Sequence, residues 1–249
     1  YRELNKVLDF DETIIPITYI NSAADLKAFC GEHGGIVCTS TNAPKILNWG
    51  FKQREKVLFF PDQNLGRWTG HKMGIPLEEM PIWDPDLPMG GLTEEEIKNA
   101  KVLLWKGHCA VHQMFRPQSI EQFRKEHPGG QVISHPESPF DVCLNSDFVG
   151  STEYILNTIK AAEPGTKWLV GTELNLVTRL AEEMKAENKH VQFMSHVVCE
   201  CSTMARIDPQ HLAWCLENLV EGNIVNQITV PAEEAALAKL TLDRMLAAS

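Results

Sequence analysis

Short apolar runs that alternate with helical segments constrain the fold of this chain most strongly. Residues 14–20 are β-branched and nearly all apolar, and similar runs follow at residues 36–39 and 56–60. Runs of this kind are typical of strands that are buried on both faces of a parallel sheet. Ser22 is expected to cap the helix after the first strand. The alternation therefore predicts an α/β fold built from βαβ units.

The same rhythm returns after a Gly-, Pro- and Trp-containing stretch. The composition of residues 65–100 predicts an ordered insertion. Near its end, Thr93 and Glu96 are expected to form a capping box for a short helix, which leads into a strand at residues 101–105. Further strands are expected at residues 131–134, 148–149, 168–170 and 191–194. Two helices then close the chain, and Asp208 is expected to cap the first of them.

Charge and cysteine usage exclude several classes of protein. The net charge is −10 without a stripe of Lys or Arg, which argues against nucleic-acid binding. No apolar run approaches the about 18 residues that a membrane span needs, so no membrane association is expected. The seven cysteines have no regular spacing, which favours metal or catalytic use over disulfides, in the cytoplasm or an equivalent reducing compartment.

Polar residues gather where strands give way to helices. In open parallel sheets ligands bind outside the carboxyl ends of the strands, so these residues could converge on one cleft. Helix starts at Ser40 and at Ser151 present free N–H groups that can hold carboxylates or phosphates. His135 and Glu137 could supply an acid and a base. Taken singly, each of these residues could equally be a cap or a core residue.

Cys109 lies between His108 and His112 at the end of the strand at residues 101–105. This soft-ligand cluster suits zinc, an iron–sulfur centre or an activated thiolate, and the spacing alone chooses none of them over a buried thiol. Cys199 and Cys201 form a CxC motif that could add one or two thiolates. A zinc site made from these cysteines would also need a histidine.

Eight motifs follow one another in order along the chain: Tyr19-Ile20-Asn21-Ser22, Cys38-Thr39-Ser40-Thr41-Asn42-Ala43, Pro61-Asp62-Gln63-Asn64-Leu65-Gly66, Gly107-His108-Cys109-Ala110-Val111-His112, His135-Pro136-Glu137, Gly150-Ser151-Thr152, Gly171-Thr172-Glu173 and Cys201-Ser202-Thr203-Met204. This ordered set, which covers almost the whole chain, resembles one family, quinolinate synthase. The segment at residues 66–99 looks like that of cyanobacterial and plastid members.

The resemblance implies a fold, a cofactor and a reaction. It implies three Rossmann-like αβα domains around a pseudo-threefold axis, each supplying one cysteine to a [4Fe-4S] cluster that acts as a Lewis acid. The implied enzyme condenses iminoaspartate with dihydroxyacetone phosphate to quinolinate, with loss of phosphate and water, in NAD biosynthesis. A functional link to L-aspartate oxidase or aspartate dehydrogenase follows, as does a cytoplasmic location, or a plastid in a plant or alga.

Residue by residue, the resemblance assigns two cluster ligands, Cys109 and Cys201, with Cys201 preferred over Cys199. A third cysteine ligand is expected upstream of Tyr1, because neither Cys30 nor Cys38 matches it. The implied catalytic residues are Tyr19, His135 and Glu137, and the implied substrate-binding residues are Tyr19, Asn21, Ser40, His135, Glu137, Ser151 and Thr152.

The resemblance also implies domain boundaries. Residues 1–107 correspond to the family's second αβα domain, with the insertion at about residues 66–100, and residues 108–200 correspond to the third. Residues 201–249 form a helical segment expected to pack on a first domain upstream of Tyr1. With two of three domains, the chain is not expected to be active alone. The alternatives are a zinc-dependent hydrolase using Cys109 with its histidines and the CxC motif, or a non-catalytic module that binds phosphometabolites.

Overall fold

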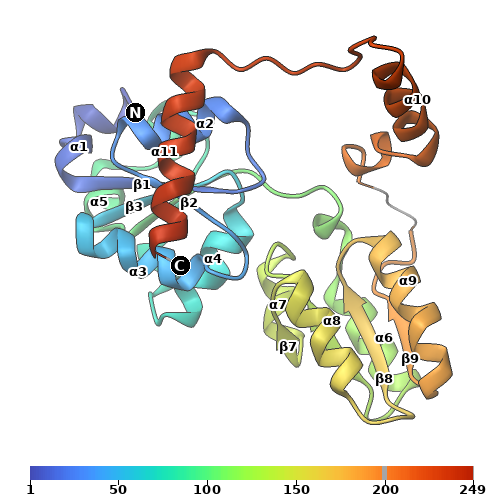
Figure 1. The fold of residues 1–249 in the computed structure, drawn as a ribbon. Helices are drawn as coiled ribbons and strands as arrows, with labels where there is room; N and C mark the ends of the chain where they lie inside the picture. Colours follow the sequence, from blue (N-terminus) through green and yellow to red (C-terminus); the bar gives the residue numbers. More distant parts are fainter. Residues whose placement is uncertain (198–200, 249) are drawn as a thin grey trace.

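The chain folds around two separate parallel sheets. We describe residues 1–197 and 201–248 from a computed structural model (Figure 1). The first sheet has the order β2-β1-β3-β5-β4 and the second β7-β6-β8-β9, and every pairing between strands is parallel. The predicted α/β class is therefore confirmed. The strands are β1 (Ile14–Tyr19), β2 (Ile36–Cys38), β3 (Lys56–Phe60), β4 (Ile82–Trp83), β5 (Val102–Trp105), β6 (Gln131–Ser134), β7 (Phe148–Val149), β8 (Lys167–Gly171) and β9 (His190–Phe193).

Helices cover both sheets. The α-helices are α1 (Phe10–Thr13), α2 (Ala24–Glu32), α3 (Ala43–Gln53), α4 (Gln63–Lys72), α5 (Glu94–Asn99), α6 (Pro117–Glu126), α7 (Phe140–Asn145), α8 (Thr152–Ala161), α9 (Leu174–Met184), α10 (Pro209–Val220) and α11 (Ala232–Ala248). The 3₁₀ turns are η1 (Leu4–Lys6), η2 (Leu77–Glu79), η3 (Pro88–Gly91), η4 (His112–Met114), η5 (Lys185–Glu187) and η6 (Met204–Arg206). We call residues 1–107 with α11 the first lobe, residues 108–197 the second lobe and residues 201–231 the α10 arm.

The first sheet is buried on both faces, as its apolar runs predict. All six residues of β1 are buried. Ile15 and Ile17 pack in one core with Leu47 of α3, and Ile14 packs in the opposite core with Phe60. Ser22 does not cap α2 as predicted, because the helix begins only at Ala24. The Ser22 hydroxyl instead accepts hydrogen bonds from the Thr18 hydroxyl and from the Lys27 ammonium.

The stretch expected to be an insertion continues the βαβ pattern at its start. Helix α4 follows β3, and Asp62 caps it by accepting a hydrogen bond from the N–H of Leu65 at 2.8 Å. A Cβ on Gly66 would lie 2.6 Å from side-chain atoms of Phe59 and Leu104, so glycine lets this helix approach the sheet. The Gly- and Trp-rich composition conceals the helix. The predicted capping box at Thr93 is confirmed.

The second lobe repeats the layered arrangement on a smaller scale. Phe123 of α6 and Val142 of α7 pack with Val132 of β6 in one core, and helices α8 and α9 cover the other face. Ser151 caps α8 by accepting a hydrogen bond from the N–H of Tyr154. This cap places the start of α8 at the carboxyl end of β7 and β6, facing the first lobe.

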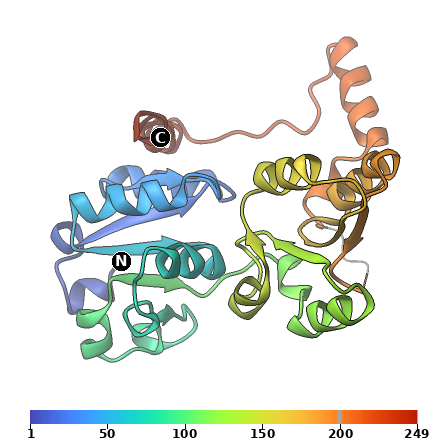
Figure 2. The same ribbon diagram turned by 90° about the horizontal axis from the view of Figure 1, so that it is seen from below.

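The two closing helices have different surroundings. Helix α11 packs against α2 and β2 of the first lobe, and Arg244 donates a hydrogen bond to the carbonyl of Gly35 at 2.8 Å. This differs from the expectation that the whole of residues 201–249 packs on an upstream domain. Helix α10 stands apart on an extended arm, and none of its residues is buried (Figures 1 and 2). Within residues 1–197 and 201–248, no helix has the length and apolarity to cross a membrane.

Candidate active site and metal centre

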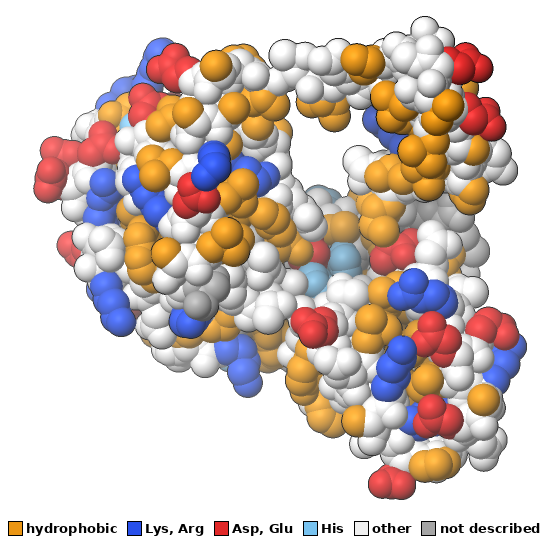
Figure 3. Space-filling view, in the orientation of Figure 1, with side chains coloured by type: hydrophobic (Ala, Val, Ile, Leu, Met, Phe, Trp, Pro, Cys, Tyr) orange, Lys and Arg blue, Asp and Glu red, His pale blue; other side chains and the backbone are white. Residues whose placement is uncertain are grey.

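The two lobes and the α10 arm enclose a cleft of about 780 Å³. Figure 3 shows histidine side chains at the bottom of this hollow, between the lobes. The parallel strands of each lobe end here, so residues that follow β1, β3, β5 and β6 come together from distant parts of the sequence. Its polar lining includes Tyr19, Asn21, Asp62, Cys109, Glu137 and Cys201.

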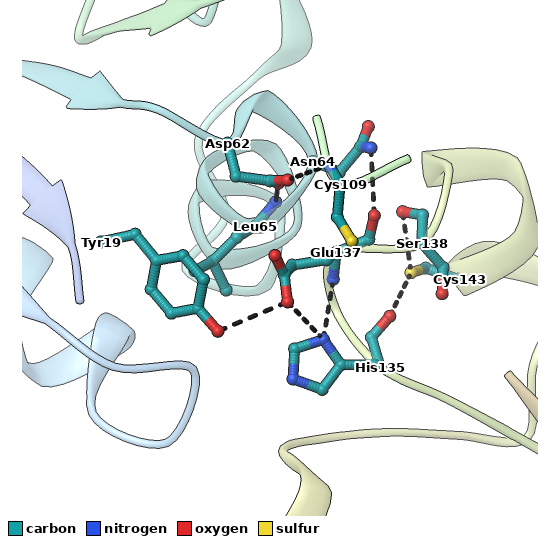
Figure 4. A network of polar contacts seen from close by, with 9 residues as sticks. All are labelled: Tyr19, Asp62, Asn64, Leu65, Cys109, His135, Glu137, Ser138 and Cys143. Carbon is teal, nitrogen blue, oxygen red and sulfur yellow. Dashed lines mark hydrogen bonds and ion pairs between the residues drawn. The ribbon is translucent and has the colours of Figure 1, made fainter. Parts of the chain in front are cut away.

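The Glu137 carboxyl group joins the two lobes. The hydroxyl of Tyr19, at the end of β1, donates a hydrogen bond to Oε2 of Glu137 at 3.3 Å (Figure 4). Nδ1 of His135 lies 3.2 Å from the same oxygen. The side-chain amide of Asn64 in α4 donates to the Glu137 carbonyl oxygen at 3.1 Å, which attaches this turn to the first lobe. The three predicted catalytic side chains therefore lie in direct contact.

Burial makes this contact a hydrogen bond between neutral groups. Burial, together with the nearby Asp62 carboxylate, raises the pKa of Glu137 to about 8. Burial lowers the pKa of His135 to about 3. An ion pair at this separation would need both groups charged, which these pKa values disfavour at pH 7. Nδ1 of His135 accepts from the N–H of Glu137 at 3.3 Å, so the imidazole proton belongs on Nε2 and Glu137 donates to Nδ1.

Asp62 is a second buried carboxyl in the cleft, and the sequence analysis did not select it. Burial raises its pKa to about 6, although the N–H groups of Leu65 and Cys109 favour its ionised form. The Cys109 N–H donates to Asp62 Oδ2 at 3.1 Å, so one carboxylate both caps α4 and positions the cysteine loop. Its signal in the sequence was an Asp two residues after a strand and three residues before an apolar helical residue.

Cys109 and Cys201 line the same cleft. Cys109 is partly buried, and burial raises the pKa of its thiol. The hydroxyl of Thr203, 3.0 Å from the Cys201 sulfur, lowers the pKa of that thiol and favours the thiolate. Cys199 lies outside the residues that the structure describes. Cys30 and Cys38 are fully buried in the first lobe.

A thiolate-bound cluster fits the chemistry of this donor set in part. Two thiols from different parts of the chain reach one cleft, and both are accessible enough to bind a group placed there. Among the described cysteines, only these two line the cleft. The residues that would hold an iron–sulfur cluster are therefore Cys109 and Cys201, with at least one further ligand from elsewhere.

Most of the predicted substrate-binding residues divide between two cavities, but His135 lines neither and reaches the large cleft only through its contact with Glu137. Tyr19, Asn21 and Glu137 line the large cleft. Ser40 and Ser151 line a smaller cavity of about 310 Å³, together with Lys72 of α4. The hydroxyl of Ser40 also hydrogen-bonds with Tyr19, so this tyrosine lies between the two cavities. Thr152 lines neither cavity and is exposed at the first turn of α8.

His112 is a functional candidate that the sequence predicts as a ligand only under the zinc-hydrolase alternative. It begins η4, its side chain is 7% exposed, and neither ring nitrogen has a hydrogen-bond partner within residues 1–197 and 201–248. Its ring lies against that of His135, with centroids 4.9 Å apart. The sequence signal was its place three residues after Cys109, but only the fold shows that both ring nitrogens lack a partner in the described part of the chain.

Comparisons with known proteins agree on one family. Residues 2–247 match the family model described as "NadA: Quinolinate synthetase A protein". The chain is 54% identical over 248 residues to a quinolinate synthase of Rhodopirellula baltica, which covers 99% of this chain and 62% of that protein. It is 52% identical over 237 residues to the Streptomyces coelicolor enzyme, covering 95% and 60%. The Herpetosiphon aurantiacus enzyme is 52% identical over 246 residues, covering 98% and 65%. The chain thus spans less than two thirds of the length of these relatives.

Proposed function

This chain belongs to the quinolinate synthase family, and from that premise we propose that it forms quinolinate from iminoaspartate and dihydroxyacetone phosphate, as part of a longer protein. The observation that carries the proposal is the hydrogen bond between Tyr19 and Glu137 in a cleft that two cysteines also line, with His135 in contact with Glu137 behind it. We further propose that an aspartate-oxidising enzyme supplies the iminoaspartate, and that the quinolinate enters NAD biosynthesis.

Cys109 and Cys201 are the proposed ligands of a [4Fe-4S] cluster. Both line the cleft, and the low thiol pKa of Cys201 suits a metal ligand. When bound, the cluster supplies an iron with an open position that acts as a Lewis acid. We propose that the third thiolate comes from a segment upstream of Tyr1, as the family resemblance implies, and the enclosure of Cys30 and Cys38 in the core of the first lobe supports this.

The protein's own residues move protons around the bound substrate. Glu137 acts as the general acid, because burial raises its pKa to about 8 and it carries a proton at pH 7. His135 accepts that hydrogen bond through Nδ1 and orients the carboxyl group, while the Tyr19 hydroxyl holds Oε2 from the other side. The departing water would take its proton from Glu137.

Substrate anions are held by helix N-termini rather than by an array of cations. Ser151 caps α8 and lines the smaller cavity, which Lys72 also lines, and the first turn of a helix is a favourable place for an anion. A phosphate or carboxylate bound beside Ser40 and Ser151 would lie next to Tyr19. This arrangement supports the assignment of anionic substrates to a protein with a net charge of −10.

We propose the following domain organisation for the longer protein. Residues 1–107 form one αβα domain, which α11 also covers, and residues 108–200 form a second. The α10 arm contacts a third domain, because the apolar residues of α10 have no cover in the described part of the chain. The greater length of the relatives supports this arrangement.

The test is quinolinate formation by the protein extended with the additional segment of its relatives and reconstituted anaerobically with iron and sulfide. Cys109→Ser and Cys201→Ser should each abolish activity and remove the cluster's visible absorbance. Cys215→Ser is the matched control, because Cys215 lies in α10 and does not line the cleft. Retention of both colour and activity in either of the first two variants would overturn the proposal.

A further inference from the structure

Three potential metal ligands of different types meet at the floor of the cleft. One ligand atom each from Cys109, His112 and Glu137 lies within 4.8 Å of the others. They come from the loop after β5, from η4 and from the turn after β6, all at the edge of the second lobe that faces the cleft. Around one zinc ion, with Zn–S about 2.3 Å and Zn–N or Zn–O about 2.0 Å, such atoms lie roughly 3 to 4 Å apart. If the three ligand atoms moved about 1 Å closer to one another, they would have the spacing of zinc ligands.

His112 provides an independent sign of a missing ligand. It is nine-tenths buried, and both of its ring nitrogens lack a partner among the described residues. A buried imidazole normally has at least one nitrogen hydrogen-bonded, because an unpaired polar atom has lost its water without compensation. The ring is held between those of Phe115 and His135. It also lines the cleft, where a metal ion could satisfy one nitrogen.

Glu137 is oriented like a metal-binding carboxylate. Its contacts with Tyr19 and His135 both use Oε2, and Figure 4 shows its other oxygen pointing away from them. Partners of this kind fix the orientation of a ligand and strengthen metal binding. The Cys109 sulfur lies beside this carboxylate, and the Cys109 N–H is held in turn by Asp62.

We propose that, in the cluster-free protein, Cys109, His112 and Glu137 bind one zinc ion, with a fourth position open to water from the cleft. A sulfur, a nitrogen and an oxygen ligand with an open position match the donor set of mononuclear zinc sites. Zinc and the proposed cluster would exclude each other, because both need the Cys109 thiolate. The zinc site itself does not depend on the proposed function, whereas its competition with a cluster does.

The test is a titration of the full 249-residue chain, freed of metal with a chelator under anaerobic conditions, with Co²⁺ and then Zn²⁺. One equivalent of Co²⁺ should produce the visible bands of tetrahedral cobalt and a thiolate-to-cobalt charge-transfer band, and Zn²⁺ should remove both. His112→Phe keeps a ring of similar size in the same packing. Cys109→Ser, His112→Phe and Glu137→Gln should each weaken zinc binding by more than the roughly 10- to 100-fold lost with an outer-shell partner.

Two controls make the test specific. His108→Ala removes the exposed neighbour of Cys109, and Cys201→Ser removes the other thiol of the cleft; both should retain zinc affinity within about threefold. Unchanged affinity in His112→Phe, with a native circular dichroism spectrum, would overturn the proposal. So would a loss in Cys201→Ser equal to that in Cys109→Ser, because it would indicate a site built on two thiolates.

Cluster reconstitution separates this inference from the proposed function. In protein extended with the relatives' additional segment, prior loading with one equivalent of zinc should suppress cluster formation at least tenfold, and a chelator should restore it. A full cluster on protein that still holds its zinc would refute the exclusion. Failure to form a cluster in the zinc-free sample would count against the proposed function, while the cobalt titration would still decide the zinc site.

Discussion

At the scale of single residues, the carboxyl of Glu137 lies where two physical effects act in the same direction. Desolvation and the nearby Asp62 carboxylate both disfavour its ionised form, and the Tyr19 hydroxyl only partly compensates. His135 and His112 are pushed the other way, toward neutral imidazole, by burial. The site therefore contains uncharged hydrogen-bonding groups at neutral pH, which suits proton transfer in a water-poor cleft.

Glu137 should make stability fall as pH rises. Its folded-state pKa of about 8 exceeds its ordinary value, so its stabilising contribution is complete at low pH and is lost as pH approaches 8. The buried histidines no longer change the pH dependence of the unfolding free energy above about pH 6.5, because they are then neutral in both the folded and the unfolded state. The effect of Glu137 can therefore be observed between about pH 6.5 and 8. Denaturant unfolding of the metal-free chain should show this decline, of about 1–2 kcal/mol.

Glu137→Gln serves as the control for this pH effect. Glutamine keeps the size and hydrogen-bonding capacity of the side chain but does not titrate, so the stability of the variant should be flat across the same window. A decline of equal size in the variant would show that another group causes it.

Tyr19→Phe should lower quinolinate formation by the extended, reconstituted protein by roughly 10²-fold, at the low end of the range for general acid–base catalysis, because the acid Glu137 stays in place but is less well oriented. The variant removes the hydroxyl that holds Oε2 of Glu137 and hydrogen-bonds with Ser40. Tyr1→Phe is the matched control, because its hydroxyl contacts Asp11 at the surface. Equal rates for the two variants would exclude Tyr19 from catalysis.

At the scale of elements, helix α4 connects the fold to the site. Its first residues include Asp62 as cap and Asn64, which holds the Glu137 turn, and its second turn packs on β3 and β5. Farther along, Trp68 lies edge-on to Phe140 of α7, with ring centroids 6.2 Å apart. A displacement of this one helix would therefore disturb both the sheet packing and the contact between lobes.

Gly66→Ala should destabilise the protein by about 1–3 kcal/mol, as expected for overpacking of a well-packed core. Its Cβ would lie 2.6 Å from side-chain atoms of Phe59 and Leu104, and the helix would have to move away from the sheet. Denaturant unfolding measures the loss. Ala43→Gly, in the first turn of α3, is the comparison variant. It removes a buried methyl group instead of adding one, so it changes a helix without overpacking the core.

Thr93→Ala should cost about 1 kcal/mol of stability, the usual value of an N-cap. The Thr93 hydroxyl accepts from the N–H of Glu96 at 3.2 Å, and the Glu96 carboxylate accepts from the N–H of Thr93 at 2.8 Å. Thr93→Ser keeps the hydroxyl and should retain most of that stability. An equal loss in both variants would indicate that the threonine methyl group, rather than the cap, is responsible.

At the scale of the whole molecule, the two lobes are held together by few contacts, while α10 extends into solvent. Helix α10 leaves a row of apolar side chains exposed at helical spacing, visible on the arm in Figure 3. The row comprises Leu212, Leu216, Leu219 and Val220, with exposures from 48% to 89%. Exposed apolar patches of this kind mark interaction surfaces.

The isolated chain should therefore self-associate through α10. Sedimentation velocity at increasing concentration should show species larger than a monomer, and replacement of Leu212, Leu216 and Leu219 by Gln should reduce them. The matched control replaces Leu77, Leu87 and Leu144, which are also about half exposed but scattered over both lobes. A chain that stays monomeric, or a control that has the same effect, would contradict the role of α10.

The sequence by itself determined the fold class, most strand positions and the residues that gather at the strand ends. Those features depend on local patterns: apolar β-branched runs such as that of β1, the capping box at Thr93, and a cysteine in the loop after β5. Helix α4 escaped recognition because its glycines serve close packing on the sheet, a requirement that composition does not reveal.

Only the tertiary structure decided the chemistry of the site. The protonation of Glu137 depends on burial and on Asp62, which is 75 positions earlier in the chain, and the significance of His112 depends on the absence of a partner. The return of α11 to the first lobe was likewise invisible in its own sequence. Desolvation and Coulomb interactions depend on which distant groups approach one another, and local sequence patterns do not specify that.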